Sequence, residues 1–288
     1  MWYKTKVTEQ CQIDYPIIQA GMAGSTTPEL VATVSELGGL GTIGAGYMTP
    51  AALEQEILKV KARTSKSFSV NLFVPESFSY TDAEVAAMND FLAPYRQALN
   101  LEQPTIGEHD SAAFDTMIDI VVEQHVPICS FTFGIPDEKT INPLKAAGGV
   151  MDSRGWLASH ALGAQGVQMG TAFITTHESN AKSVHKQAIF NSNETDAIVT
   201  HEISGKPARG LHNALIQHLR EEGPAVLPYP IQNDLTKQIR AAAGKAGLTK
   251  WMHMWSGQGV RLSQDHDAAT FFKQLIQNAQ SQAEQFNM

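Results

Sequence analysis

Cysteine is scarce in this sequence, and the usual patterns of metal-binding or acyl-enzyme sites are missing. Cys11 and Cys129 are the only cysteines among 288 residues, too few for a disulfide framework or a cysteine-rich metal site. None of the ten histidines belongs to a His-x-x-x-His, Cys-x-x-His or His-Glu-x-x-His motif. The Gly-x-Ser-x-Gly nucleophile elbow is absent as well. We therefore expect neither a metal site nor acyl-enzyme chemistry.

Positive charge and long apolar runs are also in short supply. Lysine and arginine number 21 against 29 acidic residues, which gives a formal net charge of −8. This balance disfavours nucleic acid and anionic membranes, because both are bound through an excess of basic residues. No apolar run is long enough to span a membrane, and residues 1–15 lack the apolar core of a signal peptide. We expect a cytoplasmic enzyme acting on a small molecule, with no nucleic-acid or membrane partner.

A unit of strand, loop and helix is present and is repeated. Residues 15–20 form a short apolar run closed by a glycine-containing loop, and Thr27 and Pro28 then provide the cap and first position of a helix that ends at Gly38. Residues 40–46 predict a second strand, followed by the same Thr-Pro signal at Thr49. Two further strands are predicted at residues 68–74 and 126–134. Strands alternating with helices favour an α/β fold with a parallel sheet.

The remaining segments are mainly helical in pattern. Periodicity over 85–99 and 112–122 predicts a helical insertion at about residues 78–124. Asp152 or Ser153 is expected to cap a helix that leads into a short strand within residues 166–173. We predict further helices at 141–147, 179–190, 211–220, 234–246 and from 268 onward, with a loop at 200–210. No linker is evident, so we expect one domain over residues 1–288 with a helical C-terminal region at about 179–288.

Three polar features lie at the carboxyl ends of predicted strands. They are the Ala20–Gly24 loop, Asn71 and the run Gln168–Thr171. In a β/α barrel these ends share one face, and the loops after the last two strands often bind phosphate through backbone N–H groups. Small and amide residues can also simply allow tight loops. Their joint occurrence favours a shared ligand, with Asn71 and Gln168 as amide donors or acceptors and Gly170 and Thr171 as N–H donors.

The glycines of residues 39–44 match the spacing of a dinucleotide-binding fingerprint. These glycines lie within the predicted strand, and the next helix begins only at Pro50. Close strand packing is therefore a better explanation than a Rossmann fold.

These segments together resemble the nitronate monooxygenase family, formerly called 2-nitropropane dioxygenases. Further similar segments are residues 38–47, 70–73, 130–134 and 204–210, in the same order over nearly the whole chain. The resemblance implies an FMN-binding (β/α)8 barrel that oxidises alkyl nitronates, such as propionate 3-nitronate, with molecular oxygen. FMN would supply the redox chemistry, while the protein positions it.

The same resemblance assigns the cofactor-binding residues. It implies that the isoalloxazine end of FMN is contacted by Ala20, Gly21, Met22 and Asn71. It implies that the phosphate end is held by Gly149, Gln168, Met169, Gly170 and Thr171. The family usually has proline where this chain has Gly21, which predicts a looser loop here.

The chain departs from the family after about Gly148. Family members continue there into a fifth strand, a sixth strand, a His-containing loop and a seventh strand, whereas this chain passes directly to residues 149–155. Roughly 70 residues, close to three strands with their helices, are missing by this comparison. We therefore expect an incomplete TIM-type barrel with about five or six parallel strands. Unless residues 146–151 form a strand or another chain covers it, the predicted strand at 126–133 would have an unpaired edge that invites homo-oligomerisation.

The internal deletion leaves the catalytic residues unassigned. It removes the histidine that the resemblance implies as general base and a flavin-contacting glutamine. A nitronate is already deprotonated, so the first hypothesis is a flavoenzyme that still oxidises nitronates but not neutral nitroalkanes. The alternative is an inactive, truncated family member that serves as a binding or assembly protein. A flavin reductase that uses a nicotinamide nucleotide is a third possibility without a sequence feature of its own.

Overall fold

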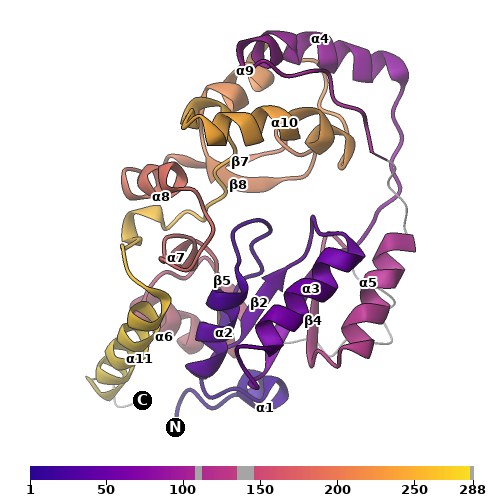
Figure 1. The fold of residues 1–288 in the computed structure, drawn as a ribbon. Helices are drawn as coiled ribbons and strands as arrows, with labels where there is room; N and C mark the ends of the chain where they lie inside the picture. The colour runs from indigo at the N-terminus through magenta and orange to yellow at the C-terminus, as the bar shows by residue number, and fades with distance from the viewer. Residues whose placement is uncertain (108–111, 135–145, 286–288) are drawn as a thin grey trace. The chain divides into compact units, whose positions relative to one another are not determined.

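The computed structural model describes residues 1–107, 112–134 and 146–285, and the chain divides into two compact units (Figure 1). The first unit comprises Met1–Glu76, Asp110–Ala181 and Leu262–Met288, and the second comprises Ser77–His109 and Lys182–Arg261. The insertion expected at 78–124 is thereby shared between them, because its first helix belongs to the second unit and its second helix to the first. A single FMN-binding domain over residues 1–288 stays a prediction.

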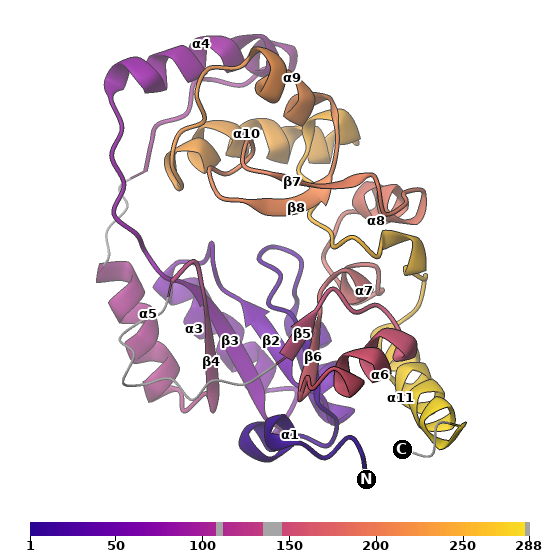
Figure 2. The same cartoon turned by 180° about the vertical axis from the view of Figure 1, so that it is seen from behind.

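Among the described residues, six parallel strands form the centre of the first unit. Their bounds are β1 Ile17–Gln19, β2 Gly41–Gly44, β3 Phe68–Phe73, β4 Ile128–Thr132, β5 Ala146–Gly148 and β6 Gly166–Met169. Two three-stranded sheets, β2-β3-β4 and β1-β6-β5, are linked by a parallel bridge between Ile18 and Leu40 (Figure 2). The strands therefore follow the order β4-β3-β2-β1-β6-β5. This confirms the predicted incomplete barrel.

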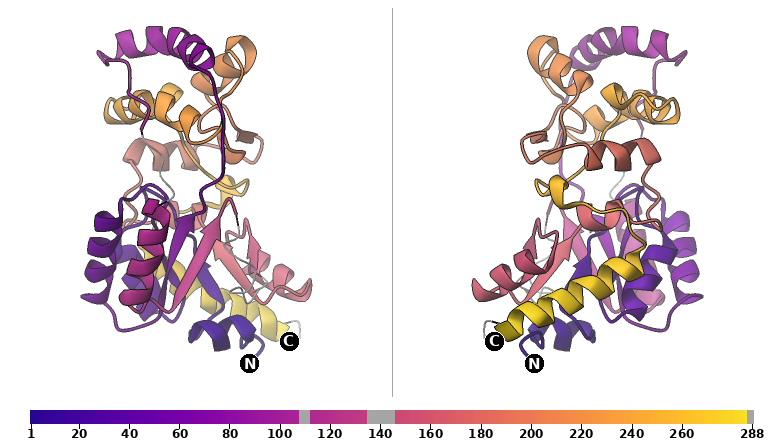
Figure 3. Two further views of the ribbon diagram at one scale, coloured as in Figure 1. Left: turned by 90° about the vertical axis from the view of Figure 1, so that its right-hand side faces the viewer. Right: turned by 90° about the vertical axis from the view of Figure 1, so that its left-hand side faces the viewer.

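Three helices of the first unit begin at predicted caps, whereas the helix before β1 was not predicted. The helices of this unit are α1 Lys6–Cys11, α2 Pro28–Glu36, α3 Pro50–Lys61, α5 Ala112–Glu123, α6 Ser153–Ala161, α7 Thr171–Ile174 and α11 Ala268–Gln285. The N–H of Leu30 donates to Thr27 Oγ1 at 3.1 Å, and Thr49 caps α3 in the same way. Asp152, rather than Ser153, caps α6 by accepting from the N–H of Gly155 at 3.1 Å. The long α11 packs against α2 and α6 (Figure 3).

The two faces of the strands differ in polarity because side chains alternate along a strand. One face packs against the helices, and its buried residues include Ile17, Ile43, Val70, Val167 and Met169. The opposite, inner face carries Thr42, Ser69, Asn71, Ser130, Thr132 and Gln168. Ile18 and Ile128 of the inner face pack on a cluster that includes Val7 and Cys11 of α1. Ile18 and Ile128 lie directly opposite Gln168 and Ser69, whereas Asn71, Ser130 and Thr132 lie further toward the carboxyl ends of β3 and β4.

The structure corrects the predicted helix at 141–147 and the end of the strand predicted within 166–173. The predicted helix at 141–147 is wrong at its end, because Ala146 and Ala147 belong to β5; residues 141–145 lie outside the described residues. Pairing with β6, with Ala146 opposite Gly166, outweighs the helix propensity of alanine. The strand predicted within 166–173 ends at Met169, and the rest begins the short α7.

The second unit consists of a two-stranded sheet and helices around their own hydrophobic core. Its elements are α4 Asp82–Ala98, α8 Ser183–Phe190, β7 Ala197–Thr200, β8 Ala208–Leu211, α9 Ala214–Glu222, α10 Ile231–Lys245 and the 3-10 turns η2 Thr249–Trp251 and η3 Val260–Leu262. Buried core residues include Leu92, Ile203, Leu219, Leu235 and Ile239. Of these turns, η3 crosses the boundary between the units at Arg261.

The predictions for this unit missed an antiparallel hairpin. Residues 200–210 were expected to be a loop, but their ends belong to β7 and β8, with Thr200 opposite Ala208. The sequence of β8, Ala-Arg-Gly-Leu, lacks the β-branched and aromatic residues that indicate a strand, so its pairing decides its structure. The sequence of β7, Ala-Ile-Val-Thr, has these residues, and this strand was missed all the same. The predicted helix starts at 179 and 211 are also wrong, since α8 begins at Ser183 and α9 at Ala214.

Strands β4 and β5 are the edges of the six-stranded array. Within residues 1–107, 112–134 and 146–285, each pairs with a single neighbour, β4 with β3 and β5 with β6. Large apolar side chains are exposed on the helices next to these strands in the chain, with Val122 of α5 at 65% and Leu162 after α6 at 90%. Helix α5 precedes β4, and α6 follows β5.

Candidate active site

The loop after β1 brings several of the predicted residues together. The N–H of Ala20 donates to the carbonyl oxygen of Met169 at 2.9 Å, which joins this loop to the end of β6. Gly21 lies directly against β3, since a Cβ atom placed on it would be 2.8 Å from the Cβ of Asn71. A Cβ atom on Gly44 would stand 2.7 Å from the backbone nitrogen of Met22. The loop backbone therefore crosses the carboxyl ends of β2 and β3.

Asn71 has hydrogen-bond partners on the neighbouring strand. Its Nδ2 donates to Ser130 Oγ at 3.0 Å and to Thr132 Oγ1 at 3.1 Å, and Thr132 Oγ1 can also donate to its Oδ1 at 3.3 Å. The side chain is 8% exposed, so these bonds meet the need of a buried amide for partners. Asn71 can offer a ligand only the remaining acceptor capacity of Oδ1.

The side of the site formed by β5 and β6 is more open. Gln168 is exposed and lies opposite Gly148 of β5. Cβ atoms on Gly148 or Gly149 would meet no described residue within 4 Å, and Gly149 has a φ of +74°, a conformation that favours glycine. A Cβ atom on Gly170 would be 3.7 Å from that of Ala20. A ligand could therefore approach the backbone of these glycines closely.

Two predicted residues face away from this opening or are enclosed. The Met169 side chain is fully buried in the core between the strands and helices. Thr171 is 6% exposed within α7. If these two residues touch a ligand, their backbone atoms have to do so.

A row of aromatic rings borders the carboxyl ends of β2, β3 and β4. Tyr47 and Phe73 form an edge contact with centroids 5.5 Å apart, and Phe73 and Phe133 are 4.8 Å apart. Gly46 permits this arrangement, because a Cβ atom there would be 2.3 Å from the Phe73 ring. Phe133 has a φ of +71°, an unusual conformation for a bulky residue. This row was not predicted from the sequence, although Tyr47 directly follows a predicted strand and Phe73 and Phe133 lie at the ends of two others.

Ser130 and Thr132 were also missed as partners of Asn71. They alternate with Cys129 and Phe131, which pack on the outer side of β4. Burial raises the pKa of the Cys129 thiol to about 12, so it stays protonated at neutral pH. The alternation of small polar with apolar residues was the available signal. None of the inner-face polar side chains from Thr42 to Gln168 named above ionises near neutral pH.

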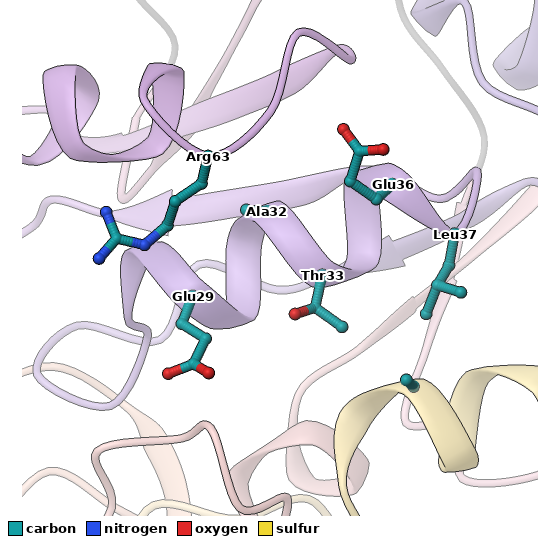
Figure 4. A pocket seen from close by; sticks show the side chains of 7 residues that line it. Glu29, Ala32, Thr33, Glu36, Leu37 and Arg63 are labelled. Carbon is teal, nitrogen blue, oxygen red and sulfur yellow. The ribbon is translucent and has the colours of Figure 1, made fainter.

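A hollow of about 560 Å³ lies elsewhere on the first unit, on the outer side of α2 (Figure 4). It is lined by Glu29, Ala32, Thr33, Glu36, Leu37, Arg63 and Ala269. None of these residues belongs to a strand, so this hollow is separate from the candidate site. In the described ranges, no three His, Cys, Asp or Glu side chains are grouped to hold a metal ion. No described helix is long and apolar enough to cross a membrane.

Known structures share this architecture. A nitroalkane oxidase from Streptomyces ansochromogenes is 27% identical, with a TM-score of 0.87 over 98% of this chain and 99% of that one. FabK from Thermotoga maritima has a TM-score of 0.73 at 23% identity, over 99% of this chain and 98% of that one, a likeness of fold alone. The parallel strands, with small and amide residues gathered at their carboxyl ends, place the chain in the TIM-barrel class.

Sequence comparison identifies the family. The model described as nitronate monooxygenase matches residues 4–145 and 141–278. A probable nitronate monooxygenase from Staphylococcus haemolyticus (strain JCSC1435) is 42% identical over 98% of each chain. One from Staphylococcus aureus (strain Newman) is 42% identical over 96% of this chain and 97% of its own. The chain belongs to the nitronate monooxygenase family.

The comparisons also support an internal deletion. The first alignment runs over 351 positions, and the chain has 288 residues, so at least 63 aligned positions hold no residue of this chain. The two segments matched by the family model meet at residues 141–145. The gap therefore falls between β4 and β5, which are the two edge strands.

Proposed function

We propose that this protein is an FMN-dependent oxidoreductase that oxidises alkyl nitronates of the propionate 3-nitronate type with molecular oxygen. The observation that carries the proposal is the convergence of the Ala20–Met22 loop, Asn71 and Gly170 at the carboxyl ends of β1, β3 and β6. Family membership supplies the reaction class. Carboxyl strand ends are where barrel enzymes carry their chemistry.

The residues around the opening fit a flavin nucleotide. Gly148, Gly149 and Gly170 leave room for a phosphate to approach the backbone, and the Gln168 carboxamide is exposed beside them. The Ala20–Met22 loop and the Oδ1 atom of Asn71 would face the ring system. Met169 and Thr171 would contribute through backbone atoms. When bound, FMN supplies the capacity to take up electrons from the substrate and pass them to oxygen.

The chain's own groups suit a substrate that is already an anion. The inner-face side chains can donate and accept hydrogen bonds but cannot remove a proton from carbon at neutral pH. The row of Tyr47, Phe73 and Phe133 offers apolar contact for an alkyl chain. These features favour nitronates over neutral nitroalkanes as substrates.

Flavin binding and oxygen uptake test this proposal. Purified protein, incubated with FMN and desalted, is expected to keep a flavin absorption band. It should consume oxygen with propionate 3-nitronate and much less with 3-nitropropionate held at a pH where the neutral carbon acid persists. Protein that retains FMN but takes up no oxygen with the nitronate contradicts the enzymatic function. Protein that keeps no flavin at all supports the inactive binding or assembly protein instead.

A further inference from the structure

Gln19 occupies the seam at which β1 and β2 separate. Along this seam the backbone N–H of Leu40 donates to the Ile17 carbonyl oxygen, and the backbone N–H of Gln19 donates to the Leu40 carbonyl oxygen, each at 2.9 Å. In a continuing parallel ladder, the next N–H of β2, that of Thr42, would donate to the backbone of β1. It donates instead to Oε1 of the Gln19 side chain at 2.9 Å. The side chain thus takes the place of a backbone ladder bond.

The other end of the same carboxamide holds the loop that follows. Gln19 Nε2 donates to the carbonyl oxygen of Ala20 and, at 3.3 Å, to Thr26 Oγ1. Thr26 Oγ1 also accepts from the N–H of Met22 at 2.9 Å. Gln19 is fully buried, so each of these bonds is made without competition from water. One carboxamide therefore joins Thr42 of β2 to both ends of the Ala20–Thr26 loop.

We infer, resting on the function proposed above, that Gln19 is a positioning residue for the flavin ring. Its carboxamide holds the Ala20–Met22 backbone in the position from which that backbone would contact FMN. Splaying β1 from β2 lets Ala20 pair with Met169 and lets the loop cross the ends of β2 and β3. A shift of the loop by a fraction of an ångström would change its contacts, since Gly21 and Gly44 leave no spare space.

Replacing Gln19 by glutamate gives a test that pH can reverse. Ionised glutamate keeps an acceptor for Thr42 but repels the Ala20 carbonyl oxygen, whereas protonated glutamate can accept from Thr42 and donate to Ala20. Burial raises the pKa of such a carboxyl group, so protonation falls within an accessible pH range. FMN affinity is measured by flavin fluorescence titration from pH 5.5 to 8.5, with the visible band of bound flavin recorded at each pH.

We expect Gln19→Glu to bind FMN at least tenfold more weakly than wild type at pH 8.5 and to approach wild type near pH 5.5. Gln55→Glu makes the same chemical change at an exposed position of α3 and should follow the wild-type curve throughout. Cooperative unfolding of Gln19→Glu at both pH values would show that the variant is folded throughout. In folded protein, a residue needed only for folding would not give a pH-dependent recovery of FMN affinity and of the visible flavin band.

The outcomes separate the inference from the function on which it rests. If wild type binds FMN and Gln19→Glu binds it equally well at pH 8.5, the positioning role is wrong and the proposed function stands. If wild type binds no FMN, both are overturned. Should Gln19→Glu fail to fold, Thr26→Val decides: it removes the hydroxyl shared by Gln19 and Met22, and unchanged FMN affinity in this variant overturns the inference.

Discussion

Gly21 has no room for a side chain, which makes it a sensitive position in the candidate site. In Gly21→Ala the new Cβ atom would be 2.8 Å from Asn71 Cβ and 3.2 Å from the carbonyl oxygen of Ile43. We expect the free energy of unfolding to fall by about 1–3 kcal/mol, as in other overpacked sites. Gly148→Ala is the matched control, because its Cβ atom meets no described residue within 4 Å. Equal melting temperatures of the two variants without FMN would contradict the crowding seen at Gly21.

His185 makes the stability of the second unit depend on pH. Burial lowers the pKa of this histidine from 6.5 to about 4, although its hydrogen bond to the Trp255 carbonyl oxygen opposes the shift. The unfolded chain therefore binds more protons than the folded one between these values, and the free energy of unfolding falls as pH drops from about 6.5 to 4. The full shift amounts to about 3 kcal/mol.

Urea unfolding at several pH values, followed by tryptophan fluorescence, measures this effect. Burial and the nearby charge of Arg240 lower the pKa of His253 as well, so the total loss should exceed that of His185 alone. His185→Gln is expected to flatten part of the pH dependence, while His212→Gln, at an exposed position, should leave it unchanged. An identical slope in both variants would rule out His185 as the source.

At the scale of elements, Glu202 connects the β7–β8 hairpin to α9 through hydrogen bonds. Its carboxylate accepts from Arg220 Nε at 2.7 Å, from the N–H of His201 at 3.0 Å and from Thr200 Oγ1. Although burial opposes ionisation, these bonds and the Arg220 charge bring the pKa of Glu202 down to about 2. The carboxylate is thus ionised across the neutral range.

Glu202→Gln should destabilise the second unit. Removing one partner of a buried ion pair costs about 3–5 kcal/mol, and we expect about 2–4 kcal/mol here because the Arg220 side chain is 43% exposed and can turn to water. Glu221→Gln removes an exposed carboxylate from the same helix and should change stability by less than about 0.5 kcal/mol. Chemical denaturation compares the two, and similar midpoints would show that the Glu202 contacts are dispensable.

Most elements with a strong local signal were predicted, although β7, Ala-Ile-Val-Thr, was missed, and the strands that depend on pairing alone were not predictable. Thr27 and Thr49 each precede a proline at the first helical position, and both caps form as expected. Strands β5 and β8 consist of alanine, arginine, glycine and leucine, so only their neighbours in space decide their conformation. At the candidate site, Asn71 could be placed at a strand end, but its bonds to Ser130 and Thr132 depend on the register of β3 with β4.

At the scale of the whole molecule, the two edge strands determine how the protein should associate. Strands β4 and β5 have unpaired edges within the described residues, and Val122 and Leu162 add exposed apolar surface on the helix before β4 and after the helix that follows β5. Edge strands readily pair with strands of other chains. Because β4 and β5 are different surfaces, joining one to the other between copies is heterologous and produces rings or open chains, unlike a two-fold dimer.

We therefore expect self-association that grows with concentration and gives a broad size distribution in sedimentation velocity. The double variant Val122→Lys, Leu162→Lys places a charge at each of these two positions and should shift the distribution strongly toward monomer. Leu58→Lys is the control, since Leu58 is 43% exposed on α3, whose strand neighbours are both paired. If the double variant and the control sediment alike, the surfaces at these two positions do not join copies of this chain. A single sharp dimer peak in wild type would instead require a two-fold contact through one surface, which joining β4 to β5 does not provide.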